Sequence, residues 1–171
     1  LNKLFGYLIH HFENFKENAG IWNKFIKLKE LGKVQKIGFS LYYPKELEYI
    51  LNNKIKCDII QVPYNIFDQR FNDYFDELKK SGVEIHIRSV FLQGLLLKDP
   101  EELSGNFIKI KDKLYALRDI SRKIGIPLSS ICINFAYLNR SIDKVIIGVE
   151  GLGNLKENLD ALKHKEQASK I

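Results

Sequence analysis

The stretch VQKIGFSLYYPKELEYILNNKIKCDIIQV, residues 34–62, decides which fold the sequence predicts. It opens with a short apolar strand, Val34 to Phe39, continues into a helix expected over Pro44 to Leu51, and ends in a second apolar strand, Cys57 to Val62. Strands that are apolar almost throughout, and that helices separate, indicate a parallel sheet with both faces covered. The stretch therefore predicts one strand–helix–strand unit of a parallel α/β fold.

The same order of strand, loop and amphipathic helix recurs before and after this unit. Two glycines, Gly32 and Gly82, each precede a strand, where a helix has to end and the backbone has to turn through positive φ. The five expected strands span Leu4 to His10, Val34 to Phe39, Cys57 to Val62, Val83 to Arg88 and Lys144 to Gly148. The expected helices span Ile21 to Leu31, Pro44 to Leu51, Phe71 to Lys80, Lys111 to Ile124, Leu128 to Leu138 and Asn154 to Lys163.

Length and composition indicate one compact domain over residues 1–171. The chain is 45% apolar, which is enough to bury a core. Its apolar runs are too short to cross a bilayer and its first residues do not form a secretion signal, so we expect no membrane contact and a cytoplasmic location. The two cysteines, Cys57 and Cys132, are expected to be buried small hydrophobes, because no metal or redox motif surrounds them. We therefore expect no metal.

Charge gives little reason to expect a nucleic-acid partner. The net charge is +6, from 27 basic and 21 acidic residues, but the lysines are spread along the chain and nearly always have an acidic neighbour. Such a distribution is typical of solvated helix faces, so we expect no nucleic acid. It still favours an anionic ligand such as a dinucleotide phosphate.

Five strands fit neither a closed eight-stranded barrel nor a doubly wound dinucleotide-binding sheet, and no G-x-G-x-x-G follows any strand. A (β/α)8 TIM barrel usually needs roughly 250 residues, so a five-unit stretch corresponds to a barrel without its first three strands. The sequence also opens with Leu1, directly ahead of a strand. We therefore expect an incomplete (β/α)8 barrel, with five of eight parallel strands present, in a chain that is a fragment or the product of a truncated gene.

Six segments at or after the strand ends resemble the aldo-keto reductase family. They are Tyr7-Leu8-Ile9-His10, Gly32-Lys33-Val34-Gln35-Lys36-Ile37-Gly38-Phe39-Ser40, Asp58-Ile59-Ile60-Gln61-Val62-Pro63-Tyr64-Asn65, Gln93-Gly94-Leu95-Leu96, Ile146-Ile147-Gly148-Val149-Glu150 and Leu155-Lys156-Glu157-Asn158. The resemblance implies the carboxy-terminal part of that family's barrel, from about the fourth strand onward. It also implies reduction of a small-molecule aldehyde or ketone to an alcohol, by hydride transfer from NADP or NAD.

The resemblance assigns roles to strand-end residues. His10 matches the family's catalytic histidine, whose neutral imidazole can donate a hydrogen bond to the carbonyl oxygen as charge develops. Ser40 and Gln61 match the family's grip on the nicotinamide carboxamide, although Leu41 stands where the family commonly has asparagine. Arg88 stands where many relatives have an aromatic ring, and it can stack, approach a phosphate or acidic substrate, or form a salt bridge at the rim.

Further cofactor-binding residues follow from the same resemblance. Those on the loop expected to wrap the diphosphate are Ser89, Leu92, Gln93 and Gly94. Gly148, Val149 and Glu150 lead to a helix whose amino terminus, near Asn154, presents free N–H groups to an anion. Glu157 and Asn158 match the pair that contacts the adenine. NADP-preferring members commonly have a basic residue at or near the position of Asn154, so the sequence leaves NADP and NAD both open.

Other functions remain open at this stage. The family's aspartate, tyrosine and lysine lie on earlier strands, so we expect the chain alone to be nearly inactive. It would then be a non-catalytic remnant or a cofactor-binding module that self-associates through the open sheet edges at Leu4 to His10 and Lys144 to Gly148. A phosphate-binding barrel enzyme such as an isomerase is a third interpretation, with Asp68 and Glu150 as candidate acids. Five aromatic residues could form a wall for a sugar or small aldehyde, although packing is favoured for most of them: Phe12, Tyr42, Tyr43, Tyr64 and Phe67.

Overall fold

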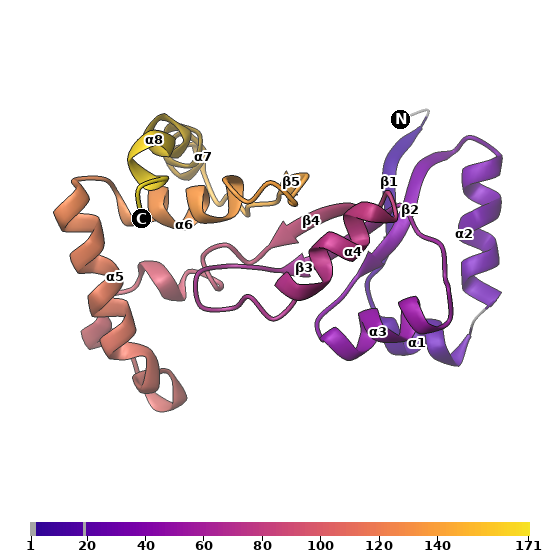
Figure 1. The fold of residues 1–171 in the computed structure, drawn as a ribbon, viewed down its shortest axis with the longest axis horizontal. Coiled ribbons are helices and arrows are strands. Elements are labelled where there is room, and N and C mark those ends of the chain that lie inside the picture. Colours follow the sequence, from indigo (N-terminus) through magenta and orange to yellow (C-terminus); the bar gives the residue numbers. More distant parts are fainter. Residues whose placement is uncertain (1–2, 19) are drawn as a thin grey trace. The chain divides into compact units, whose positions relative to one another are not determined.

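The computed structural model describes residues 3–18 and 20–171, in which strands alternate with helices along the chain (Figure 1). The strands are β1 Leu4–Ile9, β2 Val34–Ser40, β3 Ile59–Pro63, β4 Glu84–Arg88 and β5 Lys144–Val145. They form one sheet in the order β1-β2-β3-β4-β5, and the pairs from β1 to β4 are parallel. The predicted parallel α/β architecture is therefore confirmed.

The helices complete this pattern. They are α1 Phe12–Glu17, α2 Gly20–Glu30, α3 Pro44–Asn52, α4 Phe75–Lys80, α5 Lys111–Ile124, α6 Leu128–Tyr137, α7 Leu152–Asp160 and α8 Lys165–Ala168. Short 3-10 turns are η1 Asn72–Tyr74, η2 Leu95–Leu97, η3 Pro100–Glu102, η4 Gly105–Ile110 and η5 Ala161–His164. The predicted helices lie within a few residues of the observed ones. In two of them one end is a 3-10 turn instead: η1 forms the start of the helix predicted over Phe71 to Lys80, and η5 forms the end of the one predicted over Asn154 to Lys163.

Two local predictions were wrong. The sequence did not predict α1, because six residues are too few to show a helical period, although Phe12 and Phe15 are buried on one side of it. The last strand was predicted to reach Gly148, but β5 ends at Val145. Ile146 is 42% exposed, so the end of this apolar run is neither part of the strand nor buried, as the prediction had required.

The chain forms two compact units. Unit 1 comprises Leu1–Tyr64, Gln69–Arg88 and Ser141–Lys144, and unit 2 comprises Asn65–Asp68, Ser89–Arg140 and Val145–Ile171. Unit 1 contains β1 to β4 and the helices α1 to α4, whereas unit 2 contains the helices α5 to α8. The expectation of one domain over residues 1–171 stays a prediction.

An aromatic cluster holds α1 and α2 against β2. Phe39 is fully buried, and the ring of Trp22 on α2 stacks on it at a centroid distance of 4.6 Å. Phe12 and Phe15 of α1 contact the same ring edge-on, at 6.3 Å and 5.0 Å. Burial of each such ring stabilises the unit by about 1.5–3 kcal/mol, so this cluster fixes α1 and α2 against the face of β2 that carries Phe39.

An acidic residue ahead of a strand ties three elements together, and the arrangement occurs twice. In each copy the carboxylate accepts a backbone N–H of the preceding strand and pairs with a lysine of the helix before that strand. The first copy consists of Lys29, Ile37 and Asp58, and the second of Lys79, Ile85 and Asp143. The backbone bonds measure 2.9 Å and 2.7 Å, so each carboxylate sets the register between a strand and its neighbour.

Glycines occupy positions where other residues would not fit. Gly32 and Gly82 have φ of 68° and 75°, which confirms the predicted left-handed turns ahead of β2 and β4. Gly38 is a case of close approach, since a Cβ added there would lie 1.8 Å from the carbonyl oxygen of Ile59 on β3. The spacing between β2 and β3 at this point therefore requires glycine.

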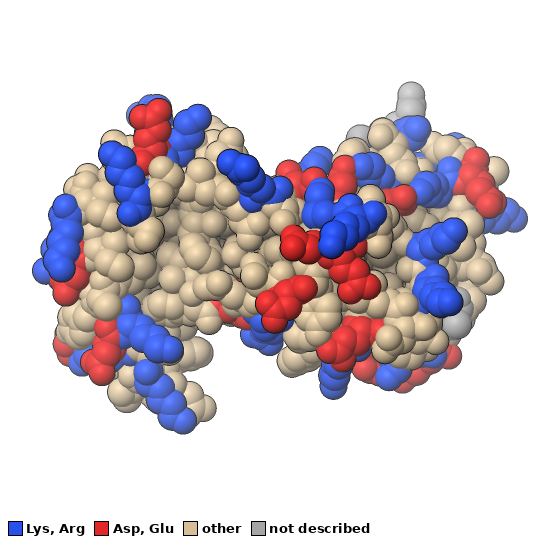
Figure 2. Space-filling view, in the orientation of Figure 1, with Lys and Arg blue, Asp and Glu red and all other residues tan. Residues whose placement is uncertain are grey.

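Neither cysteine forms a disulfide, and burial raises the pKa of both thiols, at Cys57 and Cys132, to about 12. Over the described residues, the helices are all too short or too polar to span a membrane. On the face shown in Figure 2, basic and acidic side chains are mixed rather than gathered into patches of one sign.

Candidate functional site

The parallel register aligns three of the expected site residues in unit 1. Ser40 pairs with Gln61, and Ile9 pairs with Phe39, so His10 follows β1 at the level of Ser40. Residues paired across parallel strands point to the same face of a sheet. His10, Ser40 and Gln61 therefore form one row across the carboxyl ends of β1, β2 and β3.

Within this row, two side chains are already bonded to each other. The hydroxyl of Ser40, which is 3% exposed, donates to Oε1 of Gln61 at 3.1 Å. The bond fixes the orientation of the Gln61 amide, because its oxygen faces the serine. A hydroxyl and an amide held side by side offer a donor and an acceptor to a planar ligand group such as a carboxamide.

Tyr42 links the row to Arg88. Its hydroxyl lies 3.4 Å from Nε2 of His10, and the guanidinium of Arg88 lies over its ring, 4.2 Å from the centroid. Arg88 also donates to the carbonyl oxygen of Leu41 at 3.0 Å. This contact with Tyr42 is not one of the roles expected for Arg88 from the sequence, and its role at the cofactor stays a prediction. The Tyr42 ring is 42% exposed and contacts two of the expected site residues, so a place in the wall of a substrate pocket stays a prediction for it.

The loop that carries Tyr42 is fixed by a buried carboxylate. Glu46, only 7% exposed, accepts the backbone N–H of Tyr42 at 2.6 Å and that of Tyr43 at 2.9 Å. This is the capping box of α3, with Pro44 at the first turn. A glutamate three residues after Tyr43 was the sequence signal for this anchor.

An ionic cluster lies on the same face of the sheet. His86 pairs with Gln61 in the register, and its Nε2 lies 3.1 Å from Glu84, which also bonds to Lys36. The hydrogen bond from Lys36 lowers the pKa of Glu84, and burial lowers the pKa of His86. Because the Glu84 pKa is lowered on folding, this carboxylate stabilises unit 1 above its ordinary pKa of 4.5, and that contribution is lost as pH falls.

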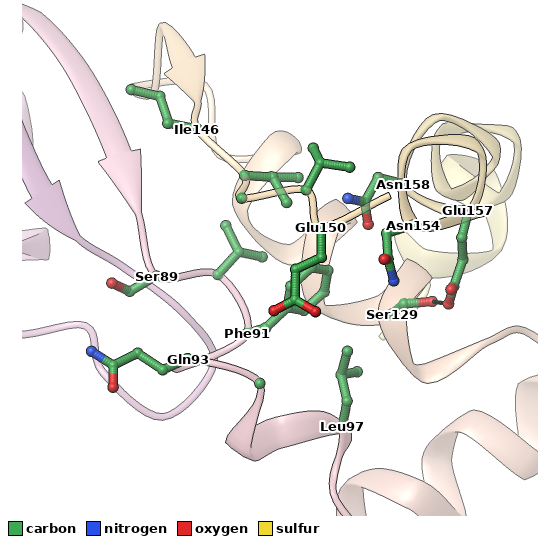
Figure 3. Close-up of a pocket in the computed structure, with 15 residues that line it drawn as sticks. Ser89, Phe91, Gln93, Leu97, Ser129, Ile146, Glu150, Asn154, Glu157 and Asn158 are labelled. Atoms are coloured by element: carbon green, nitrogen blue, oxygen red, sulfur yellow. Dashed lines mark hydrogen bonds between the residues drawn. The ribbon is translucent and has the colours of Figure 1, made fainter. Parts of the chain in front are cut away.

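Unit 2 holds a cavity of about 620 Å³, shown in Figure 3. It is bounded by the loop after β4, the segment after β5, the start of α6 and the first turns of α7. Nine of the residues expected from the resemblance line it: Ser89, Gln93, Gly94, Gly148, Val149, Glu150, Asn154, Glu157 and Asn158. Leu92 lies in the same loop but does not line the cavity.

The loop after β4 is held in a left-handed conformation. Ser89, Leu92 and Gln93 have φ of 61°, 49° and 56°, and Gly94 has 83°. Non-glycine residues adopt this region at a cost of about 1 kcal/mol or more each, so the surrounding structure has to fix it. Fully buried Asn65 does so in part, since its amide donates to the Ser89 carbonyl oxygen at 3.0 Å.

Helix α7 contributes both backbone and side-chain groups. Its N-cap, Gly151, supplies no side-chain acceptor, so first-turn N–H groups are available to a ligand. Further along, Glu157 accepts a hydrogen bond at 2.7 Å from the hydroxyl of Ser129, which is 4% exposed. Figure 3 shows this pair at the edge of the cavity, next to Asn154. Free N–H groups together with amides and carboxylates form a donor and acceptor set that fits a dinucleotide.

Solved structures match the fold over nearly the whole chain. Aldo-keto reductase AKR11C1 from Bacillus halodurans in its holo form gives a TM-score of 0.76 at 20% identity, covering 99% of this chain and 59% of that one. MGS-M4, an aldo-keto reductase from a Medee basin deep-sea metagenome library, gives 0.68 at 21% identity, covering 98% and 60%. An aldo/keto reductase from Brucella melitensis gives 0.64 at 23% identity, covering 99% and 60%.

The chain therefore spans about three fifths of the length of these reductases, and its fold corresponds to five strands of their (β/α)8 barrel. No curated protein matches it by sequence. The family model described as the aldo/keto reductase family matches residues 4–171. This match includes both the strand-end row of unit 1 and the cavity of unit 2, and the chain belongs to the aldo/keto reductase family.

Proposed function

We propose that the chain supplies the cofactor site and the catalytic histidine of an NAD(P)H-dependent reductase that converts an aldehyde or ketone to an alcohol. Membership of the aldo/keto reductase family supports an oxidoreductase function. The observation that carries the finer proposal is the cavity of unit 2, where nine residues matched to the family's cofactor site come together. The bound nicotinamide would supply the hydride.

Within unit 2, different groups suit different parts of the cofactor. The left-handed loop from Ser89 to Gly94 and the first turn of α7 offer backbone N–H groups to a diphosphate. Glu157 and Asn158 of α7 would bind the adenine. In unit 1, Ser40 and Gln61 would bind the carboxamide, since they present a hydroxyl and an amide side by side.

His10 would act on the substrate. A neutral imidazole at the end of β1 can donate a hydrogen bond to a carbonyl oxygen, and that bond strengthens as negative charge develops. We find no residue in the sequence that takes the place of the family's aspartate, tyrosine and lysine. Loss of a general acid costs about 10²–10⁴-fold in rate, so the chain alone would reduce carbonyls only slowly.

Calorimetric titration of the full chain with NADH and with NADPH tests the cofactor site without requiring turnover. We expect saturable binding of at least one nucleotide, and about tenfold weaker binding for Asn158→Ala, which removes an amide from the cavity. Glu166→Gln is the matched control, because Glu166 is exposed on α8 and does not line the cavity. Failure of both nucleotides to bind would contradict the proposal.

A second candidate function is a cofactor-binding module that self-associates through β1. This strand lies at the end of the sheet order, and Leu4, Phe5 and Tyr7 are 42–43% exposed on it. An exposed apolar edge strand can pair with another chain. Light scattering after size exclusion distinguishes the two, since association would give a dimer that Phe5→Lys converts to a monomer. A monomeric wild-type chain would exclude this candidate.

A further inference from the structure

The described residues that line the cavity of unit 2 include acidic side chains and no basic ones. Two carboxylates, Glu150 and Glu157, line it, and the described residues that form its wall include neither lysine nor arginine. The remaining lining is apolar or neutral and polar. Figure 3 shows the Glu150 side chain among the residues that line the cavity.

The basic residue closest in sequence to the first turn of α7 does not line this cavity. Lys156 lines a second hollow of about 380 Å³, to which α6, α7 and η5 contribute and which shares Glu157 with the main cavity. Asn154, by contrast, lines the main cavity. A ligand in that cavity therefore meets a neutral amide at this turn of the helix.

The position of one of the two acids is fixed by the fold. Ser129 lies at the start of α6, is 4% exposed, and donates its hydroxyl to Glu157 Oε1 at 2.7 Å. Because this donor is nearly buried, the carboxylate is held at the cavity edge rather than free to turn away into solvent. Any ligand that enters the cavity therefore meets a fixed negative charge at α7.

From these charges we infer that the cavity selects NAD over NADP. The inference rests on the proposed function and extends it to the class of cofactor. Free ribose hydroxyls are donors and carboxylate oxygens are acceptors, so an unphosphorylated adenosine ribose is compatible with Glu150 and Glu157. A phosphate on that ribose carries a charge of about −1.5 to −2 and would share the cavity with two carboxylates, whereas the described lining residues include no lysine or arginine to neutralise it. Like charges brought into one cavity disfavour binding.

The test compares two ligands that differ only in that phosphate. ADP-ribose and 2′-phospho-ADP-ribose are titrated into the full chain by calorimetry, and NADH and NADPH follow as the complete cofactors. We expect the unphosphorylated ligand to bind about tenfold or more tightly, as expected when unit charges about 4 Å apart interact near a protein surface. Equal or tighter binding of the phosphorylated ligand would overturn the inference but leave the proposed function intact. If neither ligand binds, the proposed function fails as well.

Two substitutions show whether charge is the cause. Glu150→Gln keeps the shape of the side chain and removes its charge. We therefore expect the preference for ADP-ribose over 2′-phospho-ADP-ribose to narrow to about threefold. Asn154→Arg adds a cation to the cavity wall and should bring the phosphorylated ligand to equal or tighter binding. Glu166→Gln, outside the cavity, should leave the ratio unchanged.

Salt provides an independent readout of the same cause. The preference of the wild-type chain should shrink as salt rises from about 0.01 M to about 1 M, because the Debye length falls from about 30 Å to about 3 Å. A preference that persists in Glu150→Gln and in Asn154→Arg, and that salt does not change, would show that the charges of the cavity do not set it.

Discussion

Unit 1 presents side chains at the ends of hydrogen-bonded strands, whereas unit 2 presents backbone in left-handed turns around a cavity. In unit 1 the polar groups are bonded to one another, as between Ser40 and Gln61 and from Glu46 to the Tyr42 backbone. In unit 2 the loop that carries strained Gln93 is held by backbone bonds, such as that from Leu92 to the Ser89 carbonyl oxygen, and by the buried amide of Asn65, which bonds the same carbonyl. A sheet therefore places side chains through its register, while a loop needs dedicated anchors.

The largest effect is expected where the sheet itself is changed. In Gly38→Ala the new methyl group would meet the Ile59 carbonyl oxygen at 1.8 Å, so β2 and β3 have to separate. We expect a loss of more than about 3 kcal/mol in the free energy of unfolding, measured with urea. Gly153→Ala is the control, because it lies in α7 with no atom within 4 Å of the added methyl group. That change should be neutral or stabilise by up to about 1 kcal/mol, and equal effects at both glycines would contradict the close approach.

The anchor of the loop in unit 2 comes next in size. Asn65→Ala removes a fully buried amide that donates to Ser89 and accepts the N–H of Phe67 at 2.9 Å. We expect a loss of about 1–3 kcal/mol in unfolding free energy together with weaker nucleotide binding, since the left-handed loop is released. Asn53→Ala is the matched control, because it removes one exposed amide bond, to Tyr49, and should cost less than about 1 kcal/mol. Unchanged nucleotide affinity in Asn65→Ala would show that Asn65 stabilises the fold but does not support nucleotide binding.

A comparison of two left-handed residues tests whether the strain in unit 2 serves binding. Gln93 has φ of 56° beside the cavity, and Lys54 has φ of 52° at the turn after α3 in unit 1. Glycine at either position should raise the unfolding free energy by about 1 kcal/mol, because it removes the steric cost of the left-handed region. Only Gln93→Gly should also weaken nucleotide binding, since glycine lets the loop leave this conformation. If both variants bind as the wild type does, the strain has no role at the site.

The sequence predicted the regular parts of this molecule better than the irregular ones, for physical reasons. Apolar runs located β2 to within one residue, because burial on both faces leaves a direct signature in side-chain type. The apolar run after Val145 led to a wrong prediction, because apolar side chains indicate burial and strand propensity but not whether the backbone bonds to a neighbouring strand. Residues Ile146 to Val149 line the cavity of unit 2 instead. The left-handed conformations of Leu92 and Gln93 could not be predicted, because neither residue type favours them. The strand-end polar residues were predictable because register brings them together.

The smallest effect concerns one hydrogen bond in unit 1. Tyr42→Phe keeps the ring under Arg88 but removes the hydroxyl that lies 3.4 Å from Nε2 of His10. A neutral ring nitrogen either donates or accepts, so this bond favours one tautomer of His10. Loss of the bond should shift the tautomer ratio about twofold to tenfold, measured from the ¹⁵N chemical shifts of the imidazole. Tyr43→Phe should leave the ratio unchanged, because Tyr43 contacts Lys45 rather than His10. An identical ratio in the wild type and in Tyr42→Phe would mean that the chain of contacts in unit 1 ends at Tyr42, and that the sheet alone orients the histidine.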